Sequence, residues 1–127
     1  MSLAAVLAPP RWKSAGLWIV RGLLALTFAG AGGAKLYGVP MLVEEFQHIG
    51  VGQWFRYVTG ALELLGAVFI LTPSLAAFGA VLLICIMIGA TITHLFVIGG
   101  SPVPALVLLA LSAIVAYAKR DQLAKIL

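Results

Sequence analysis

Residues 57–71 of the chain read YVTGALELLGAVFIL, an apolar run with a single carboxylate, Glu63, near its middle. With its flanking residues, the run is long enough to cross a bilayer. A carboxylate at the centre of a membrane helix costs about 2.5 to 3.5 kcal/mol on insertion scales, so it is expected to face a protein interior or a wet cavity and to have a partner. The stretch therefore predicts a membrane helix with a polar contact at Glu63.

The composition of the whole chain is typical of a membrane protein. Of its 127 residues, 63% are hydrophobic and 9% are charged, whereas a soluble domain has about 25% charged residues. Four apolar segments approach the roughly 20 residues that span a hydrocarbon core: Leu17–Leu36, Gln53–Thr72, Ser74–Ile98 and Pro102–Ala118. We expect an all-α fold, an integral membrane four-helix bundle that forms a single transmembrane domain over residues 1–127.

Basic residues near both ends of the chain predict the topology. They flank the start of the first segment and follow the last: Arg11, Lys13, Arg21, Lys119, Arg120 and Lys125. The positive-inside rule therefore places both termini in the cytoplasm. Arg21 lies within the first segment and is expected to extend its side chain to the cytoplasmic headgroups. The net charge of +4 then anchors the protein at the lipid bilayer and does not indicate a nucleic-acid partner.

The first outer connection, residues 37–52, is expected to contain a short amphipathic helix at the membrane interface. Pro40 suits the first turn of a helix and Gly50 its end. Three apolar residues between them recur at helical spacing: Leu42, Phe46 and Ile49. This helix either packs its apolar face onto the bundle or forms a lid over a site.

Four ionisable side chains from three segments are expected in the outer half of the bundle: Lys35, Arg56, Glu63 and His94. Arg56 and Glu63 lie two turns apart on one helix face, with Thr59 between them. Met87 shares a face with His94 on the third segment. The sequence therefore predicts a polar cluster lined by small and apolar residues.

This cluster has both a chemical and a structural interpretation. Glu63 is expected to form an ion pair with Arg56, Lys35 or a protonated His94, or else to be neutral. In an enzyme, Glu63 and His94 would be the catalytic residues, as general acid or base and as proton relay. Arg56, Lys35, Thr59 and Met87 would bind the ligand. Alternatively, Glu63 and Arg56 simply hold the helices together, as interhelical polar contacts do in membranes.

Several other chemistries are disfavoured. Cys85 is the single cysteine, which excludes a two-cysteine exchange mechanism within one chain, and it is expected in the core. His48, His94, Glu44 and Glu45 lack the spacing of a metal-binding helix, so no metal site is expected.

The spacing of small and polar residues resembles the DoxX family, most closely its short DoxX-like branch. The resemblance covers about residues 18–118, and Glu63 with the pair Thr93–His94 carries most of it. The other residues that carry it are Gly33, Ala34, Lys35, Leu36, Phe46, Gly50, Thr59, Gly60, Leu64, Gly66, Ala67, Pro73, Gly79, Ala80, Met87, Gly89 and Ala90. The resemblance implies a four-helix protein of the bacterial cytoplasmic (inner) membrane.

The same resemblance implies little about activity. The family takes its name from a subunit of a thiosulfate:quinone oxidoreductase, and other relatives are described as partners of redox enzymes or as chaperones of membrane proteins. Our first hypothesis is a subunit that binds a lipophilic small molecule or docks beside a membrane oxidoreductase partner, with a homodimer as a further arrangement. No cofactor is expected, although a quinone is compatible with the residues.

The second hypothesis is a small membrane-embedded isomerase or cyclase that acts on a lipophilic substrate, with Glu63 as general acid or base. Ion or proton transport is a weaker third hypothesis. A conduction path needs polar groups at both ends of the membrane, and the inner half of this chain offers little besides Arg21.

Overall fold

The computed structural model describes residues 11–126 as an all-α protein. In chain order the elements are α2 (Arg11–Tyr37), α3 (Pro40–Ile49), α4 (Gln53–Leu71), α5 (Ala76–Thr93), the π-helical turn η1 (His94–Ile98), α6 (Val103–Ala118) and α7 (Arg120–Ala124). The short amphipathic helix predicted between Pro40 and Gly50 is present as α3, beginning at Pro40 and ending before Gly50, which adopts the left-handed conformation at φ 84°. The predicted third segment begins at Ala76, two residues later than expected, because residues 73–75 form the turn from α4.

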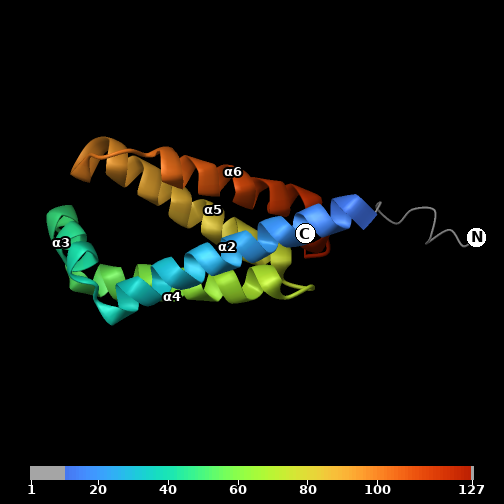
Figure 1. Ribbon diagram of the computed structural model, residues 1–127, viewed down its shortest axis with the longest axis horizontal. Coiled ribbons are helices and arrows are strands. Elements are labelled where there is room, and N and C mark those ends of the chain that lie inside the picture. Colours follow the sequence, from blue (N-terminus) through green and yellow to red (C-terminus); the bar gives the residue numbers. More distant parts are fainter. Residues whose placement is uncertain (1–10, 127) are drawn as a thin grey trace, which may run out of the picture.

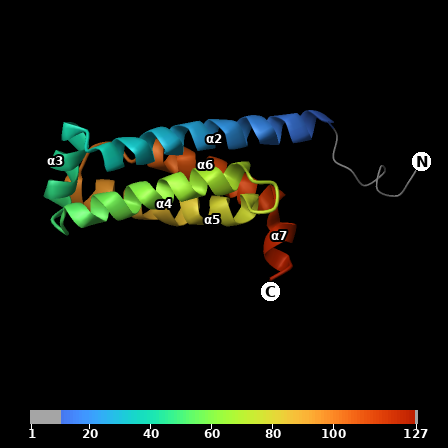
Figure 2. The ribbon, with the colours of Figure 1, turned by 90° about the horizontal axis from the view of Figure 1, so that it is seen from below.

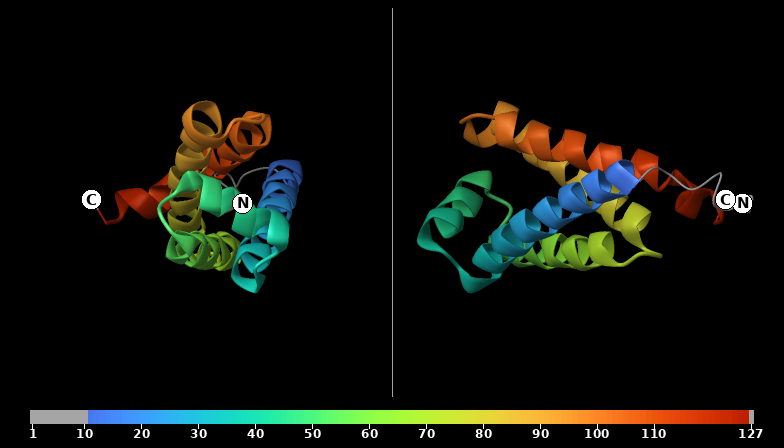
Figure 3. Two further views of the ribbon diagram at one scale, coloured as in Figure 1. Left: turned by 90° about the vertical axis from the view of Figure 1, so that its left-hand side faces the viewer. Right: turned by 45° about the vertical axis from the view of Figure 1, so that its right-hand side comes forward.

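The long helices pack as two antiparallel pairs. Helix α2 packs on α4, α5 packs on α6, and α4 and α5 join the two pairs. The pairs diverge toward one end of the bundle, where α3 crosses between them (Figure 1 and the right panel of Figure 3). The start of α2 and the short α7 lie at the opposite end (Figure 2). The two helix pairs are therefore close together at one end of the bundle, the closed end, and separated at the other end, which α3 covers.

Within residues 11–126, three helical segments are long and apolar enough to cross a membrane: Trp12–Tyr37, Gln53–Leu71 and Ala76–Ile98. The predicted fourth span is an apolar helix of 16 residues, α6, which at 1.5 Å per residue is only about 24 Å long. It begins at Val103, after the positive-φ residues Gly99 and Gly100 and then Pro102. Large apolar side chains such as Leu26, Val68 and Phe96 are exposed on the bundle. These surfaces suit lipid, and the chain is a multi-pass membrane protein.

Glycines bring the paired helices into close contact. A Cβ atom added to Gly32 of α2 would lie 2.6 Å from the carbonyl oxygen of Gly60 on α4, and one added to Gly60 would lie 2.9 Å from the carbonyl oxygen of Gly32. Small residues allow backbones to approach in this way where lipid supplies no hydrophobic drive for association. Nearer the closed end, Gly66 of α4 leaves room for the Leu83 side chain of α5, whose Cδ2 would lie 2.6 Å from an added Cβ atom.

The expectation that Arg21 reaches the headgroups is wrong. Its side chain is 1% exposed, its Nε donates a hydrogen bond to the carbonyl oxygen of Ile70 at 2.7 Å, and its guanidinium lies over the Trp18 ring. Ile70 is in the last turn of α4, where backbone carbonyls lack helical partners. The arginine satisfies one of them with a charge-assisted hydrogen bond.

We expect Arg21→Met to lower the free energy of unfolding by about 1.5 kcal/mol, because the Ile70 carbonyl would lose a charged donor. Arg120→Met is the matched control, since the exposed Arg120 makes the same kind of bond to the Tyr117 carbonyl at 2.7 Å, and it should cost less than about 0.5 kcal/mol. Detergent-denaturation curves followed by circular dichroism measure both changes. Equal losses in the two variants would contradict a special role for Arg21.

Candidate functional site

Glu63 forms an ion pair with Lys35 across the α2–α4 contact. Lys35 Nζ lies 2.8 Å from Glu63 Oε1, the Glu63 side chain is 2% exposed and the Lys35 side chain 15%. The close approach of Gly32 to Gly60 sets the two backbones near enough for this pair to form. Of the three partners considered from the sequence, the structure therefore brings Lys35, and not Arg56 or His94, to Glu63.

Arg56 is buried but is occupied elsewhere. Its Nε donates to Gln53 Oε1 at 2.8 Å, and its Nη1 donates to the backbone carbonyl of Lys35. Lys35 is in the last turn of α2, so Arg56 satisfies a free carbonyl there as Arg21 does at the end of α4. Arg56 supports the backbone that carries Lys35 but is not among the residues that line the neighbouring cavity.

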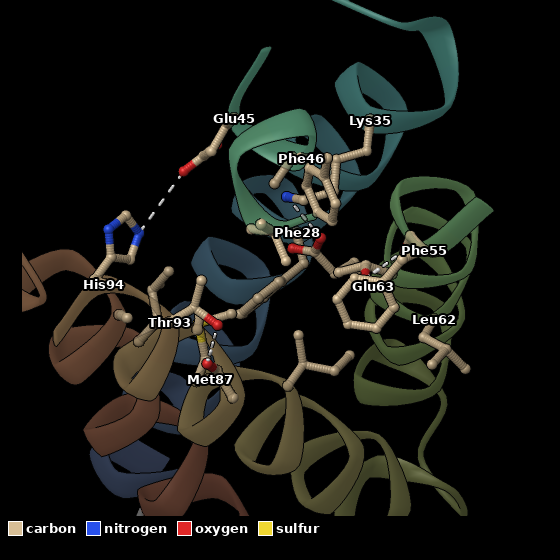
Figure 4. Close-up of a pocket in the computed structure, with 18 of the residues that line it drawn as sticks. Phe28, Lys35, Glu45, Phe46, Phe55, Leu62, Glu63, Met87, Thr93 and His94 are labelled. Atoms are coloured by element: carbon tan, nitrogen blue, oxygen red, sulfur yellow. Dashed lines mark hydrogen bonds and ion pairs between the residues drawn. The ribbon is translucent and has the colours of Figure 1, made fainter. Parts of the chain in front are cut away.

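A cavity of about 430 Å³ lies beside the ion pair, between the two diverging helix pairs. Its walls come from α2, α3, α4, α5, η1 and α6, and Figure 4 shows Lys35 and Glu63 at one side of it. Its main apolar lining residues are Phe28, Phe46, Phe55, Leu62, Met87 and Leu108. Leu62 on α4 and Cys85 on α5 are exposed at its edge, so the cavity opens to the lipid-facing surface between these helices.

A second polar contact lies at the edge of the cavity, where α3 meets η1. Glu45 Oε1 and His94 Nε2 are 3.9 Å apart, and His94 Nδ1 is 3.0 Å from the Gly99 carbonyl oxygen. Figure 4 shows Glu45 extending from α3 toward His94, away from Glu63. His94 thus lines the same cavity as Glu63 but is paired with a different carboxylate.

The two remaining predicted ligand-binding residues, Thr59 and Met87, both line the cavity. Met87 is buried, and the Thr59 hydroxyl donates to the Phe55 carbonyl at 2.8 Å. Cys85, expected in the core, is exposed at the cavity edge. That expectation is wrong because an apolar run in a membrane helix can face lipid as well as the core.

Sequence reasoning missed several residues of the site. Phe28 and Phe55 were not identified, because an aromatic residue in a membrane segment has no distinguishing signal in one sequence. Glu45 was considered only as a metal ligand, although its position on the buried side of the amphipathic helix, next to Phe46, could have indicated a contact with the bundle. The sequence leaves Lys35, Arg56 and His94 as equal candidates for the partner of Glu63, because contacts between helices cannot be read from spacing.

The arrangement is a mainly apolar chamber with one neutralised ion pair in its wall. A buried charge pair is tolerated in lipid because each ion compensates the other. Such a chamber can enclose an apolar molecule and offer it a few fixed polar groups, as ligand sites commonly do.

Residues 19–117 match the DoxX-like family. The uncharacterized protein YdgD of Bacillus subtilis (strain 168) is 38% identical over 77 residues, which are 58% of this chain and 68% of that protein. No solved structure matches the chain. The match to the family covers most of the chain, and the protein belongs to the DoxX-like family.

Proposed function

We propose that this DoxX-like protein binds a lipophilic small molecule in the cavity beside Lys35 and Glu63. The observation that carries the proposal is an apolar cavity of about 430 Å³ with a buried ion pair in its wall. If the pair served only to hold helices together, close packing around it would be expected, since interiors contain few voids larger than a water molecule. The opening between α4 and α5 would admit a ligand directly from the bilayer.

For the membrane arrangement we propose four spans, with both termini in the cytoplasm of a bacterial cell and α3 on the outer side of the cytoplasmic membrane. The basic residues at the start of α2 and after α6 support this orientation. The α6 helix would complete its span with the loop before it or by local thinning of the bilayer. The cavity would then lie in the outer half of the membrane.

The protein would act as a binding or accessory subunit, beside a membrane oxidoreductase or as a homodimer. A quinone is compatible with the size and apolar lining of the cavity. This assignment to a redox partner is supported by the resemblance to the family and not by a redox group in the chain.

A second candidate, a membrane-embedded isomerase or cyclase, is supported by the presence of Glu63 and His94 in the wall of one cavity. Glu63 would be the general acid or base and His94 the proton relay. Turnover of a lipophilic substrate by Glu63→Gln and His94→Ala variants, once folded, tests it: loss of about 100-fold or more in each supports catalysis. Unchanged turnover would remove both residues from the mechanism.

Filling part of the cavity should weaken binding. We expect Gly89→Phe, which adds a ring at a lining position with no atom within 4 Å of the new Cβ, to weaken saturable photolabelling by a diazirine-bearing dodecanone in nanodiscs by about tenfold. Gly30→Phe is the matched control, since Gly30 also has open space around it but lies outside the cavity wall. Mass spectrometry of the labelled peptides gives the site. Equal labelling of both variants, or labelling that never saturates, would contradict the proposal.

A further inference from the structure

The polar groups in the cavity wall differ in how far they are already engaged. The hydroxyls of Thr27, Thr59 and Thr93 donate to backbone carbonyls of their own helices at 2.8 Å each. Lysine Nζ carries three N–H donors, and within residues 11–126 its one polar contact is the ion pair with Glu63 Oε1 at 2.8 Å. A carboxylate can accept several hydrogen bonds, so Glu63 also has free capacity. Its side chain is 2% exposed and that of Lys35 is 15% exposed, so the more accessible free group at this side of the cavity is the Lys35 donor.

The charge in this part of the cavity is also already balanced. Lys35 and Glu63 neutralise each other at 2.8 Å. A third full charge placed beside them in an apolar chamber would have no counterion, and burial of an uncompensated charge is costly. An anion would in addition meet the carboxylates of Glu63 and, at the cavity edge, Glu45.

We propose that the ligand is an uncharged lipophile whose carbonyl oxygen accepts a hydrogen bond from Lys35 Nζ. Its apolar body lies against Phe28, Phe46 and Met87, and it enters from the bilayer past Leu62 and Cys85. This assignment rests on the proposed function, because it names the chemical class of the ligand for the same site.

The test is a competition series with one chain length and four head groups. The wild-type protein in nanodiscs is photolabelled with the diazirine-bearing dodecanone in the presence of excess dodecanone, dodecane, dodecyl sulfonate or dodecyltrimethylammonium. We expect dodecanone to compete about tenfold better than the other three, the size of one hydrogen bond to a charged donor. Equal or better competition by dodecane or either ion overturns the inference but leaves lipophile binding intact. Absence of saturable labelling in the cavity overturns the proposed function itself.

A substitution that removes one charge should change the preference. Glu63→Gln leaves Lys35 without its counterion, so dodecyl sulfonate should gain about tenfold as a competitor. Glu44→Gln is the control, because Glu44 undergoes the same chemical change at an exposed position of α3 outside the cavity wall. Unchanged competition by sulfonate in a folded Glu63→Gln protein would overturn the role of the ion pair, and the wild-type series tests the ligand class even if this variant fails to fold.

Discussion

Lys35→Met is expected to lower the free energy of unfolding by about 3 kcal/mol, one of the two largest effects that the structure predicts. The substitution keeps much of the apolar side chain but leaves Glu63, which is 2% exposed, without its partner at 2.8 Å. Loss of one member of a buried pair is more costly than loss of both, because the remaining charge is uncompensated. Detergent titration followed by circular dichroism measures the change.

The double variant Lys35→Met/Glu63→Gln should recover most of this loss, since it removes the orphaned charge together with its partner. Lys125→Met is the matched control at an exposed position near the end of α7, and it should be nearly neutral. A double variant as unstable as Lys35→Met alone would mean that the pair does not act as a unit.

Gly32→Ala is the second large effect, and we expect it to cost about 2 kcal/mol of unfolding free energy. The new Cβ atom would lie 2.6 Å from the Gly60 carbonyl oxygen, a backbone atom that can move only if α4 moves. Separation of the helices would also lengthen the Lys35–Glu63 contact. Stability and photolabelling of the cavity should therefore both decrease in this variant.

The neighbouring glycine supplies the control. A Cβ atom at Gly33 has no atom within 4 Å, and the helix is otherwise the same. Gly33→Ala should be neutral or stabilising by up to about 1 kcal/mol, since alanine is the better helix former. If Gly32→Ala were equally well tolerated, the close approach of α2 and α4 would not be needed for stability.

The helical segments could be predicted because their signals are local. Long apolar runs predicted four membrane spans, of which the structure shows three helices long enough to cross a membrane and one shorter apolar helix, α6. Pro40 with Gly50 predicted the bounds of α3. The predicted fourth segment is slightly longer than α6, because it includes Pro102. The start and the end of a helix depend on neighbouring residues, and these can be identified in one sequence.

The pairing of side chains between helices could be predicted only in part. Spacing placed Arg56 and Glu63 on one face but did not indicate their partners. Both are buried against α2, where Arg56 contacts the Lys35 carbonyl and Glu63 the Lys35 ammonium. Which atom of Lys35 meets which residue depends on the rotation and axial position of two helices. The cavity depends on the divergence of two helix pairs, for which the sequence contains no local signal.

Arg21 and Arg56 are both buried, and each donates a hydrogen bond to the helix that carries the other. Arg21 of α2 binds the Ile70 carbonyl of α4, and Arg56 of α4 binds the Lys35 carbonyl of α2. Arg21 and Lys35 are fourteen residues apart on α2, and Arg56 and Ile70 are fourteen residues apart on α4. The two contacts therefore lie at opposite ends of the α2–α4 interface, with the same spacing on both helices. A slide of α2 along α4 in either direction would break both contacts at once. Any enlargement of the cavity for a ligand must therefore come from movement of α3, α5 and α6 against this fixed pair.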